Sequence, residues 1–356
     1  MRLGIIGLPQ SGKTTLFNAL TRGDQPITVS GGRFEVHTAV IDVPDPRLER
    51  LSALFQPGKT TFAKVTYADI AGLEGAPGKN GLTGQLLNLL SQMDGLIHVV
   101  RCFENPGVPH PLGGVDALRD LAALEAELLL SDLISVERKL ERLADEQRRA
   151  AGRDRTHIAR EAHLFERLRT ALSSERPLRD VDLSSDEEKI LSGHAFLTRK
   201  PTILVLNLAD AQPPPDLQIP FARSAVIPLQ GKLEMELAQL PQEDARLFMA
   251  EYGVETLSLE RLISLSYELL GLQSFFTVGK DEVRAWTVRG GASALEAAGA
   301  IHSDLHKGFI RAEVVGYADL LHLGGLAEAR ARGKLRLEGR DYTVQDGDIV
   351  HIRFNL

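Results

Sequence analysis

The sequence predicts an α/β protein with a mostly parallel sheet, an inserted helical hairpin and a small C-terminal α+β module. Apolar strand-like runs alternate with helical segments over residues 1–110 and 195–272, a pattern typical of parallel sheets with crossover helices. Residues 111–194 carry helical spacing without strand signals. Residues 273–356 return to short alternating runs around one helix. We expect these ranges to be, respectively, one discontinuous domain, an inserted helical domain and a C-terminal domain.

Bulk composition excludes several classes of protein. A chain of 356 residues is long enough for more than one core. The net charge of −7 disfavours general nucleic-acid coating, and we expect no DNA binding. The single cysteine, Cys102, cannot form an intrachain disulfide, which favours the reducing cytoplasm. No apolar run approaches the roughly 18 residues of a membrane span. We therefore expect a cytoplasmic protein without membrane contact. We also expect a monomer, although composition does not bear on the oligomeric state.

Residues 7–14 read Gly-Leu-Pro-Gln-Ser-Gly-Lys-Thr, directly after an apolar strand and before a helix expected over 13–20. In this G-x-x-x-x-G-K-T pattern, backbone N–H groups and the helix N-terminus surround phosphate oxygens. Lys13 would reach the β- and γ-phosphates, and the Thr14 hydroxyl would ligate Mg²⁺. The pattern predicts a P-loop nucleotide-binding domain. The expected nucleotide contacts here are Pro9, Gln10, Ser11, Gly12, Lys13, Thr14 and Thr15.

A second motif follows the strand-like runs 34–43 and 62–70. The second run ends in Asp-Ile-Ala-Gly, which places Asp69 beside the P-loop as a further Mg²⁺ ligand and Gly72 near the γ-phosphate. Glycines then recur at every third position over 72–84, which suits a switch loop that lacks local order without ligand. The alternative is a flexible connector.

The remaining α/β elements are read from apolar periodicity. We expect a helix over 82–93, strands over 95–102, 202–206 and 224–228, and helices to about 270.

The helical insertion has two seams. Leucines and a valine recur at spacings of four and three within 117–149, and a second seam covers 158–172 after a polar turn over 150–155. Two such helices should pack as an antiparallel coiled-coil hairpin. Many charged residues in the distal half favour a hairpin that projects from the nucleotide domain, although both helices could instead cover the sheet.

The C-terminal module has balanced charge, which fits a docking surface for a folded partner better than a salt-driven RNA contact. Its expected elements are strands over 282–288, 309–315, 342–344 and 348–354, with a helix over 292–307.

A third motif, Asn-Leu-Ala-Asp at 207–210, follows the strand at 202–206. In GTPase-type switches this position reads N-K-x-D, where Asn ties the base loop to the P-loop and Asp accepts hydrogen bonds from guanine. Leu208 replaces the lysine, so the base pocket is altered. We assign Asn207, Leu208, Asp210 and Gln230 to the nucleotide site.

Together these motifs resemble the YchF or Obg-like ATPases, a branch of the Obg-related translation-factor GTPases, along nearly the whole chain. The resemblance implies a Mg²⁺-dependent, ATP-preferring NTPase that associates with the ribosome, with the large subunit as the expected contact, and takes part in regulating translation. It identifies the C-terminal module as a β-grasp-like TGS domain, which with the hairpin would contact the ribosome and its RNA. The matching stretches beyond the P-loop are 43–48, 69–73, 117–142, 281–287, 298–302, 307–313 and 346–348.

The resemblance also implies expectations about catalysis. Leu73 occupies the position of the water-orienting glutamine of Ras-like switches, and a leucine cannot align water, so slow intrinsic hydrolysis is expected. The family's substitute is a loop histidine that matches His110, which we assign as catalytic with Lys13 and Gly72. A solvated loop histidine is the equal alternative.

Three departures from the family pattern leave alternatives open. Gln10 stands where the family has Asn, which affects any monovalent-cation site. The switch threonine falls on Arg33, with Thr28 as a possible replacement. Asp210 replaces a glutamate and would accept two hydrogen bonds from guanine but repel adenine N1. ATPase, GTPase and a nucleotide-gated scaffold with negligible turnover therefore all remain open.

Overall fold

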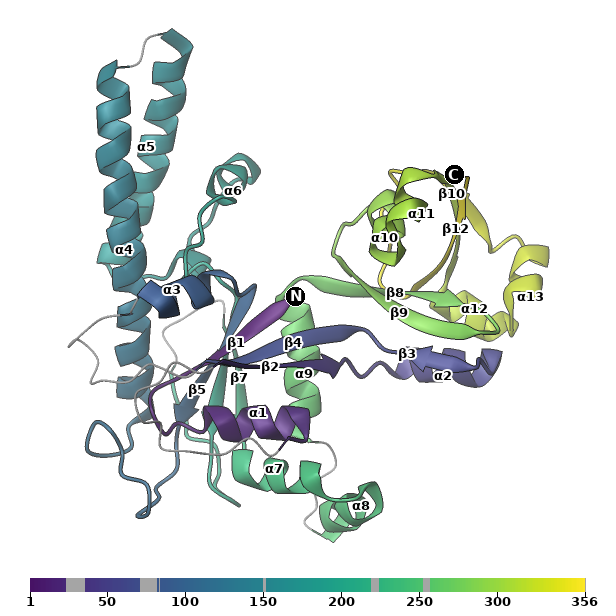
Figure 1. The fold of residues 1–356 in the computed structure, drawn as a ribbon, viewed down its shortest axis with the longest axis horizontal. Coiled ribbons are helices and arrows are strands. Elements are labelled where there is room, and N and C mark those ends of the chain that lie inside the picture. Colours follow the sequence, from purple (N-terminus) through teal and green to yellow (C-terminus); the bar gives the residue numbers. More distant parts are fainter. Residues whose placement is uncertain are drawn as a thin grey trace. The chain divides into compact units, whose positions relative to one another are not determined.

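The computed structural model describes residues 1–23, 36–70, 82, 84–149, 152–218, 224–251 and 257–355. It divides into two compact units, Met1–Ala39 with Thr66–Leu259 and Val40–Val65 with Glu260–Leu356. Two six-stranded sheets form the framework (Figure 1). Within the described ranges, no helix is long and apolar enough to cross a membrane. The predicted three-domain division stays a prediction, and it did not anticipate that Val40–Val65 would group with the C-terminal residues.

The first sheet has the strand order β2-β4-β1-β5-β6-β7, and every pair from β4 to β7 is parallel. Strands β5 and β6 are buried along their full length, as is usual for central strands of a parallel sheet. The strands are β1 (Arg2–Ile6), β2 (Val36–Asp42), β4 (Lys64–Ile70), β5 (Gly95–Arg101), β6 (Thr202–Asn207) and β7 (Ser224–Leu229). The helices interspersed with or following these strands are α1 (Lys13–Thr21), α3 (Gly84–Ser91), α7 (Gly231–Gln239), α8 (Gln242–Glu251) and α9 (Ser258–Leu269). The α/β prediction is confirmed.

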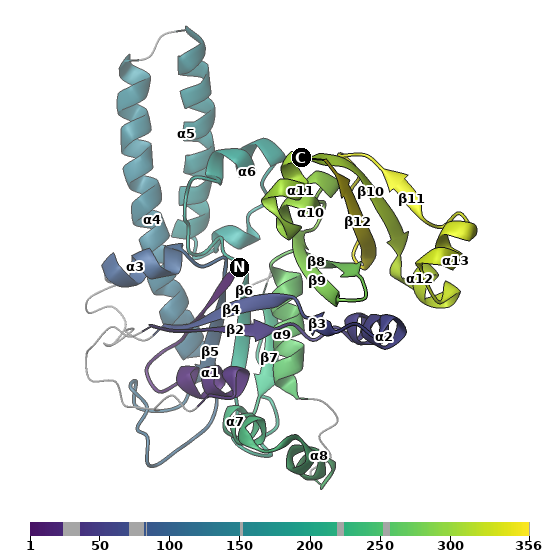
Figure 2. The ribbon, with the colours of Figure 1, turned by 45° about the vertical axis from the view of Figure 1, so that its right-hand side comes forward.

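The helical insertion consists chiefly of α4 (Ala117–Arg149) and α5 (Gly152–Ser173), which pack side by side in both Figures 1 and 2. The predicted range of the first helix is confirmed. The predicted turn over 150–155 is too long, because α5 already begins at Gly152. The chain returns to the sheet through a 3₁₀ turn, η1 (Leu178–Asp180), and α6 (Ser185–Leu191).

The two ends of the hairpin have different surroundings. At the proximal end, Leu124 and Leu128 of α4 join a buried cluster with sheet residues. Farther along, Val136 and Leu143 pack in a cluster with α5 and the segment that follows it. The distal helices extend away from the sheet in both views (Figures 1 and 2). Projection is therefore correct for the distal half, whereas the proximal end of α4 covers the sheet.

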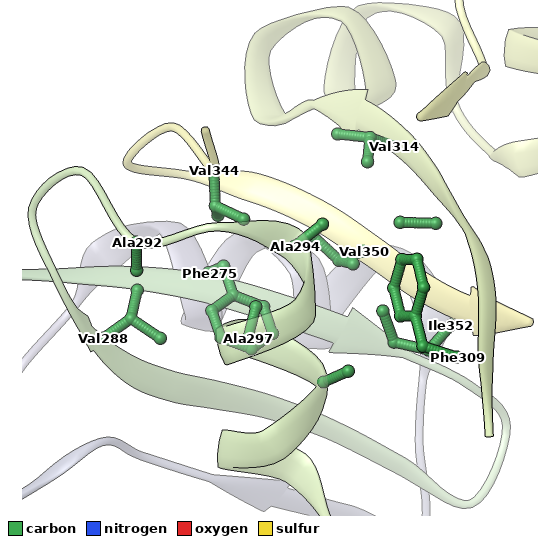
Figure 3. Close-up of a cluster of buried hydrophobic side chains, with 12 residues drawn as sticks. Phe275, Val288, Ala292, Ala294, Ala297, Phe309, Val314, Val344, Val350 and Ile352 are labelled. Carbon is green, nitrogen blue, oxygen red and sulfur yellow. The ribbon is translucent and has the colours of Figure 1, made fainter. Parts of the chain in front are cut away.

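The second sheet has the order β11-β10-β12-β8-β9-β3. Its apolar core lies between the sheet and α10, where Phe275, Phe309 and Ile352 gather around small helix residues (Figure 3). Ala294, Ala297 and Ala298 allow this close approach of helix and sheet. The strands are β3 (Lys59–Thr61), β8 (Leu272–Val278), β9 (Glu282–Arg289), β10 (Phe309–Gly316), β11 (Arg336–Glu338) and β12 (Asp348–Phe354). The helices are α2 (Pro46–Phe55), α10 (Ala294–Ile301), α11 (Ser303–Lys307), α12 (Tyr317–Leu323) and α13 (Leu326–Ala331).

Two predictions in this unit need correction. The helix expected over 292–307 is broken at His302, whose extended backbone ends α10 and whose ring caps α11. The strand expected over 342–344 makes only an isolated bridge from Thr343 to Ser293.

Helix α2 begins with a strong local start signal. Asp45 accepts a hydrogen bond from the Arg47 backbone N–H, and Pro46 occupies the first helical position. The Arg47 guanidinium then donates to both carboxylate oxygens of Asp346, at 2.7 and 3.2 Å, and lies 5.3 Å from the ring centroid of Phe276. Burial lowers the pKa of Arg47, but the carboxylates of Asp45 and Asp346 raise it. The net result is a pKa above the usual range of arginine. This pairing fastens α2 to the second sheet.

Candidate nucleotide-binding site

The predicted P-loop connects the end of β1 to the start of α1. Gly12 has φ 98°, a left-handed conformation that favours glycine, and a Cβ there would overlap the Asn207 amide. At Gly7 a Cβ would overlap the carbonyl oxygen of Val99 on β5. Both glycines of the motif are therefore required by close packing against neighbouring strands, which gives the loop a fixed shape.

Lys13 lies over this loop. Its Nζ donates hydrogen bonds to the carbonyl oxygens of Gly7 at 3.1 Å and Leu8 at 3.0 Å. If the loop wraps around the phosphates of a nucleotide, this ammonium group lies close to them. The predicted role of Lys13 is consistent with this position.

Thr14 and Asp69 meet beside the loop, as the two motifs predict. The Thr14 hydroxyl donates to Asp69 Oδ2 at 2.8 Å, although the two residues lie on different elements, α1 and β4. Burial raises the pKa of Asp69, and the Thr14 hydrogen bond and the charge of Lys13 oppose that shift. Asp69 Oδ1 is buried without a hydrogen-bond partner among the described residues. A hydroxyl and a carboxylate with a spare oxygen are hard donors, and this pair fits Mg²⁺.

Asn207 ties the base-motif loop to the P-loop. Its Nδ2 donates to the Ser11 carbonyl at 2.9 Å, and its Oδ1 accepts from the Gly231 N–H at 3.1 Å. The amide is buried, so both hydrogen bonds are shielded from water. One side chain thus joins three segments: the P-loop, the end of β6 and the start of α7.

The other residues assigned to base recognition lie in different environments. Leu208 is buried in an apolar cluster with Val100 and Leu121, so its side chain packs into the protein. Asp210 is exposed. Gln230 precedes the first residue of α7. Their contacts with a nucleotide remain predictions.

His110 is not a solvated loop residue, so that alternative is wrong. Its side chain is only 4% exposed, and Nε2 lies 2.7 Å from Asp120 Oδ2. Nδ1 accepts a hydrogen bond from the Leu112 N–H, which assigns the hydrogen of the neutral ring to Nε2. This arrangement fixes the ring and its tautomer. A catalytic role for His110 stays a prediction.

Several predicted switch residues lie outside the described residues: Thr28, Arg33, Gly72 and Leu73.

Two residues that shape this edge of the sheet were not predicted from the sequence. Arg101 ends β5 and is buried; it donates to the carbonyls of Phe103 and Val108 and lies 4.7 Å from the Phe103 ring centroid. Gln212 accepts from the Ala209 N–H and donates to the Cys102 carbonyl, which holds the base-motif loop against β5. The available signal for Arg101 was a charged residue at the end of the mostly apolar run 95–101.

The sequence and structure of this chain are similar to those of several known proteins. "Ribosome-binding ATPase YchF" of Bacillus subtilis (strain 168) is 39% identical over 365 residues, covering 99% of each chain. The proteins of the same name from Haemophilus influenzae and Escherichia coli O157:H7 are 40% and 39% identical, covering 100% of this chain and 99% of theirs. The chain belongs to the YchF family. The resemblance stated from the sequence is thereby confirmed.

Family models and a solved structure agree with membership of the YchF family. The C-terminal YchF-GTPase model, described as "protein of unknown function", matches residues 272–355. A model described as "50S ribosome-binding GTPase" matches residues 2–139. The structure titled "Structure of the Schizosaccharomyces pombe YchF GTPase" has a TM-score of 0.88 and 31% identity, covering 99% of this chain and 97% of that one. The YchF fold, an α/β GTPase-type domain with a characteristic C-terminal domain, is that of this chain.

Proposed function

We propose that this protein is a Mg²⁺-dependent, ATP-preferring nucleotide hydrolase that binds the ribosome and takes part in regulating translation in the cytoplasm. The observation that carries the proposal is the 2.8 Å contact between Thr14 and Asp69 beside Lys13. These three groups supply the cation-binding and phosphate-binding chemistry of a P-loop switch. The names of the bacterial relatives support both ATP and the ribosome.

Each residue of this site has a defined task. Lys13 and the loop N–H groups bind and orient the phosphates, and Thr14 with Asp69 holds the cation. A Mg²⁺ ion held by these two residues would neutralise negative charge on the phosphates during hydrolysis. Turnover is slow because Leu73 cannot orient water. His110, fixed by Asp120, is the residue that we assign to water positioning.

Ribosome contact is assigned to the hairpin and to the C-terminal module, for which we retain the TGS assignment. Arg138, Arg142 and Arg149 are exposed on distal α4, where they can meet RNA phosphates. The family-model description "50S ribosome-binding GTPase" supports the large subunit as the partner. We propose that the protein acts as a monomer.

A GTPase of the same architecture is the second candidate. Asp210 is exposed and matches the guanine-reading aspartate, and the fission-yeast relative is titled a GTPase. A carboxylate would accept two hydrogen bonds from guanine but would be repelled by the unprotonated N1 of adenine.

Calorimetric titration of the Mg²⁺-loaded, nucleotide-free protein with ATP and with GTP decides between these candidates. ATP binding at least about tenfold tighter, a difference of about 1.4 kcal/mol, supports the first candidate. Tighter binding of GTP supports the second, and Asp210→Ala should then weaken GTP selectively. Phosphate release at the rate of a protein-free control, with ribosomes present, would instead identify a scaffold without turnover.

Lys13→Ala should abolish tight binding of both triphosphates, because the β- and γ-phosphates lose their cation. The matched control is Lys232→Ala, since Lys232 is exposed on α7 and pairs with Glu236 of the same helix. Unchanged triphosphate affinity of Lys13→Ala in the same titration would refute the P-loop assignment.

A further inference from the structure

Residues 196–200, here called the connecting segment, leave the helical insertion and lead into β6. At its far end, β6 carries Asn207, which contacts the P-loop. Along its length the connecting segment is attached to α4 on one side and to α3 on the other. It therefore contacts both the hairpin and the helix that follows the predicted phosphate sensor.

The attachment to α4 is made by a buried carboxylate. Asp132 Oδ1 accepts from the Leu197 N–H at 2.9 Å, while Oδ2 accepts from the Thr198 N–H and hydroxyl, each at 2.7 Å. Thr198 is fully buried, and its carbonyl accepts from the backbone N–H of Arg179 at 3.0 Å. Arg179 in turn pairs with Glu125 of α4 at 2.6 Å, with both side chains buried. Buried, hydrogen-bonded groups of this kind hold one geometry.

The attachment to α3 has an apolar and a polar part. The Leu197 side chain packs in one buried cluster with Leu86 and Leu90 of α3 and with Leu124 and Leu128 of α4. Lys200 Nζ donates to the Ser91 carbonyl at 3.1 Å and also to the Met93 carbonyl. A cation at a helix C-terminus satisfies carbonyls that have no partner within the helix. Movement of α3 would therefore have to break these contacts or move the connecting segment with it.

Helix α3 is well placed to respond to the nucleotide. It begins at Gly84, shortly after the predicted sensor glycine Gly72. The cluster that buries Leu86 and Leu90 also contains Ala68 and Ile70, which flank the predicted Mg²⁺ ligand Asp69 on β4. Loss of the γ-phosphate commonly rearranges the segment after such a sensor.

We propose that the connecting segment couples α3 to the helical hairpin, with Lys200 and Asp132 as positioning residues, so that nucleotide state sets the arrangement of the hairpin base. Coupling of this kind is reciprocal, so a partner bound to the hairpin changes nucleotide affinity by the same factor. The inference rests on the proposed function for the identity of nucleotide and partner.

Backbone hydrogen exchange of the full chain tests the coupling without a ribosome. Exchange is compared between nucleotide-free protein and protein saturated with Mg²⁺ and a non-hydrolysable ATP analogue. We expect the analogue to change exchange both in α3 and around residues 125–136 and 178–180. Lys200→Met keeps the aliphatic stem but removes the hydrogen bonds to the Ser91 and Met93 carbonyls. In this variant the analogue should still change hydrogen exchange in α3, but at least about half of the change in exchange at the hairpin base should be lost.

Controls separate coupling from general destabilisation. Lys189→Met changes an exposed lysine on α6 that pairs with Asp186 of the same helix, and it should behave as the parent protein. Asp132→Asn keeps the shape of the side chain but replaces one acceptor by a donor, and it should also uncouple the hairpin. The inference is overturned if the analogue binds but leaves the hairpin base of the parent protein unchanged, or if the change persists in both variants.

Ribosome sedimentation supplies a second readout. If ribosome affinity of the parent protein differs between nucleotide states by about 5- to 150-fold, the usual range of such coupling, Lys200→Met should reduce that difference to about twofold. A parent protein that binds no ribosomes in any state contradicts the proposed function but leaves the hydrogen-exchange result standing. Equal nucleotide discrimination by parent and Lys200→Met would contradict the coupling.

Discussion

At the scale of single residues, Asn207 joins separate segments of the candidate site with an uncharged side chain. Its amide is buried and bridges the P-loop and the start of α7 through one donated and one accepted hydrogen bond. The N-x-x-D motif predicted this tie, because the asparagine of the corresponding N-K-x-D motif in GTPase-type switches joins the base loop to the P-loop. The environment of Leu208 was not predictable, since its burial depends on α4 and β5, which are distant in the sequence.

Asn207→Ala should weaken binding of ATP and GTP alike, because the Ser11 carbonyl and the Gly231 N–H lose their common partner. Leaving buried polar groups unpaired costs about 1–3 kcal/mol, or roughly 5- to 150-fold in affinity if it falls on the nucleotide-bound state. Calorimetric titration measures this effect. Asn88→Ala on the exposed side of α3 is the control, and a selective loss of one nucleotide would contradict a purely structural tie.

His98 gives the protein a specific acid sensitivity. It lies fully buried on β5, and burial, with smaller effects of Arg179 and Lys13, lowers the pKa of His98 to about 3. The unfolded chain binds a proton at this histidine below pH ~6.5, whereas the folded chain stays neutral until about pH 3. The contribution of His98 to stability is therefore constant above about pH 7 and falls as the pH drops below ~6.5.

Between about pH 7.5 and 5.5 this histidine should reduce the free energy of unfolding by about 1 kcal/mol. His98→Gln should remove that part of the pH dependence, whatever its effect on stability at neutral pH. Urea unfolding at both pH values measures the difference. His322→Gln, on an exposed position of α12, should keep the parent slope; an equally steep slope in His98→Gln would contradict the prediction.

At the scale of elements, local patterns predicted the helices and strands best where apolar periodicity is long. The range of α4 was predicted correctly because its leucine seam repeats over many turns. Helix α2 and strand β8 were missed; the Asp45-Pro46 start signal was present but preceded a helix of only 10 residues. The run 342–344 was predicted as a strand, but Thr343 makes only an isolated bridge. Whether such a short run pairs with another strand depends on distant residues and cannot be predicted from the run itself.

Arg47→Met should loosen α2 and β3, because the side chain no longer reaches both oxygens of Asp346 or covers Phe276 with its guanidinium. Both charged groups are partly exposed, so we expect a cost of about 1 kcal/mol in the free energy of unfolding. Faster hydrogen exchange over residues 46–61 would locate the effect. Arg332→Met removes an exposed pair with Glu328 within one helical turn and should change little; equal effects of both variants would contradict a special role for Arg47.

At the scale of the whole molecule, the motifs assigned to nucleotide binding and the helical hairpin assigned to ribosome contact occupy different parts of the chain. The P-loop, sensor and base motifs define one α/β domain, and the hairpin is inserted between its strands β5 and β6. The family and the fold were predictable from the sequence because several motifs agreed in order. The grouping of Val40–Val65 with the C-terminal residues was not, because it depends on pairing between β3 and β9, which lie far apart in the sequence.

Replacing Arg138, Arg142 and Arg149 together by glutamate should lower ribosome affinity without changing nucleotide affinity. Phosphate binding releases counterions, so the salt dependence should also become shallower by roughly one unit for each phosphate that the protein no longer binds. Sedimentation at several salt concentrations measures both effects. Replacing Arg332 and Arg340, which are exposed in the C-terminal unit, by glutamate tests that unit in the same way. If the hairpin variant keeps the parent's ribosome affinity, these three arginines do not contribute to ribosome binding.

The pairing of β3 with β9 also determines which fragments of this protein can be expressed in folded form. The family-model match over residues 272–355 suggests a self-sufficient tail. Expressed alone, that tail would lack β3 and α2, so the edge of β9 would be open and the fully buried Phe276 would be without the Arg47 side chain that lies over it. Open edges and bare aromatic surface promote aggregation. A soluble fragment of this unit would therefore have to carry residues 40–65 as well, for example grafted through a new linker.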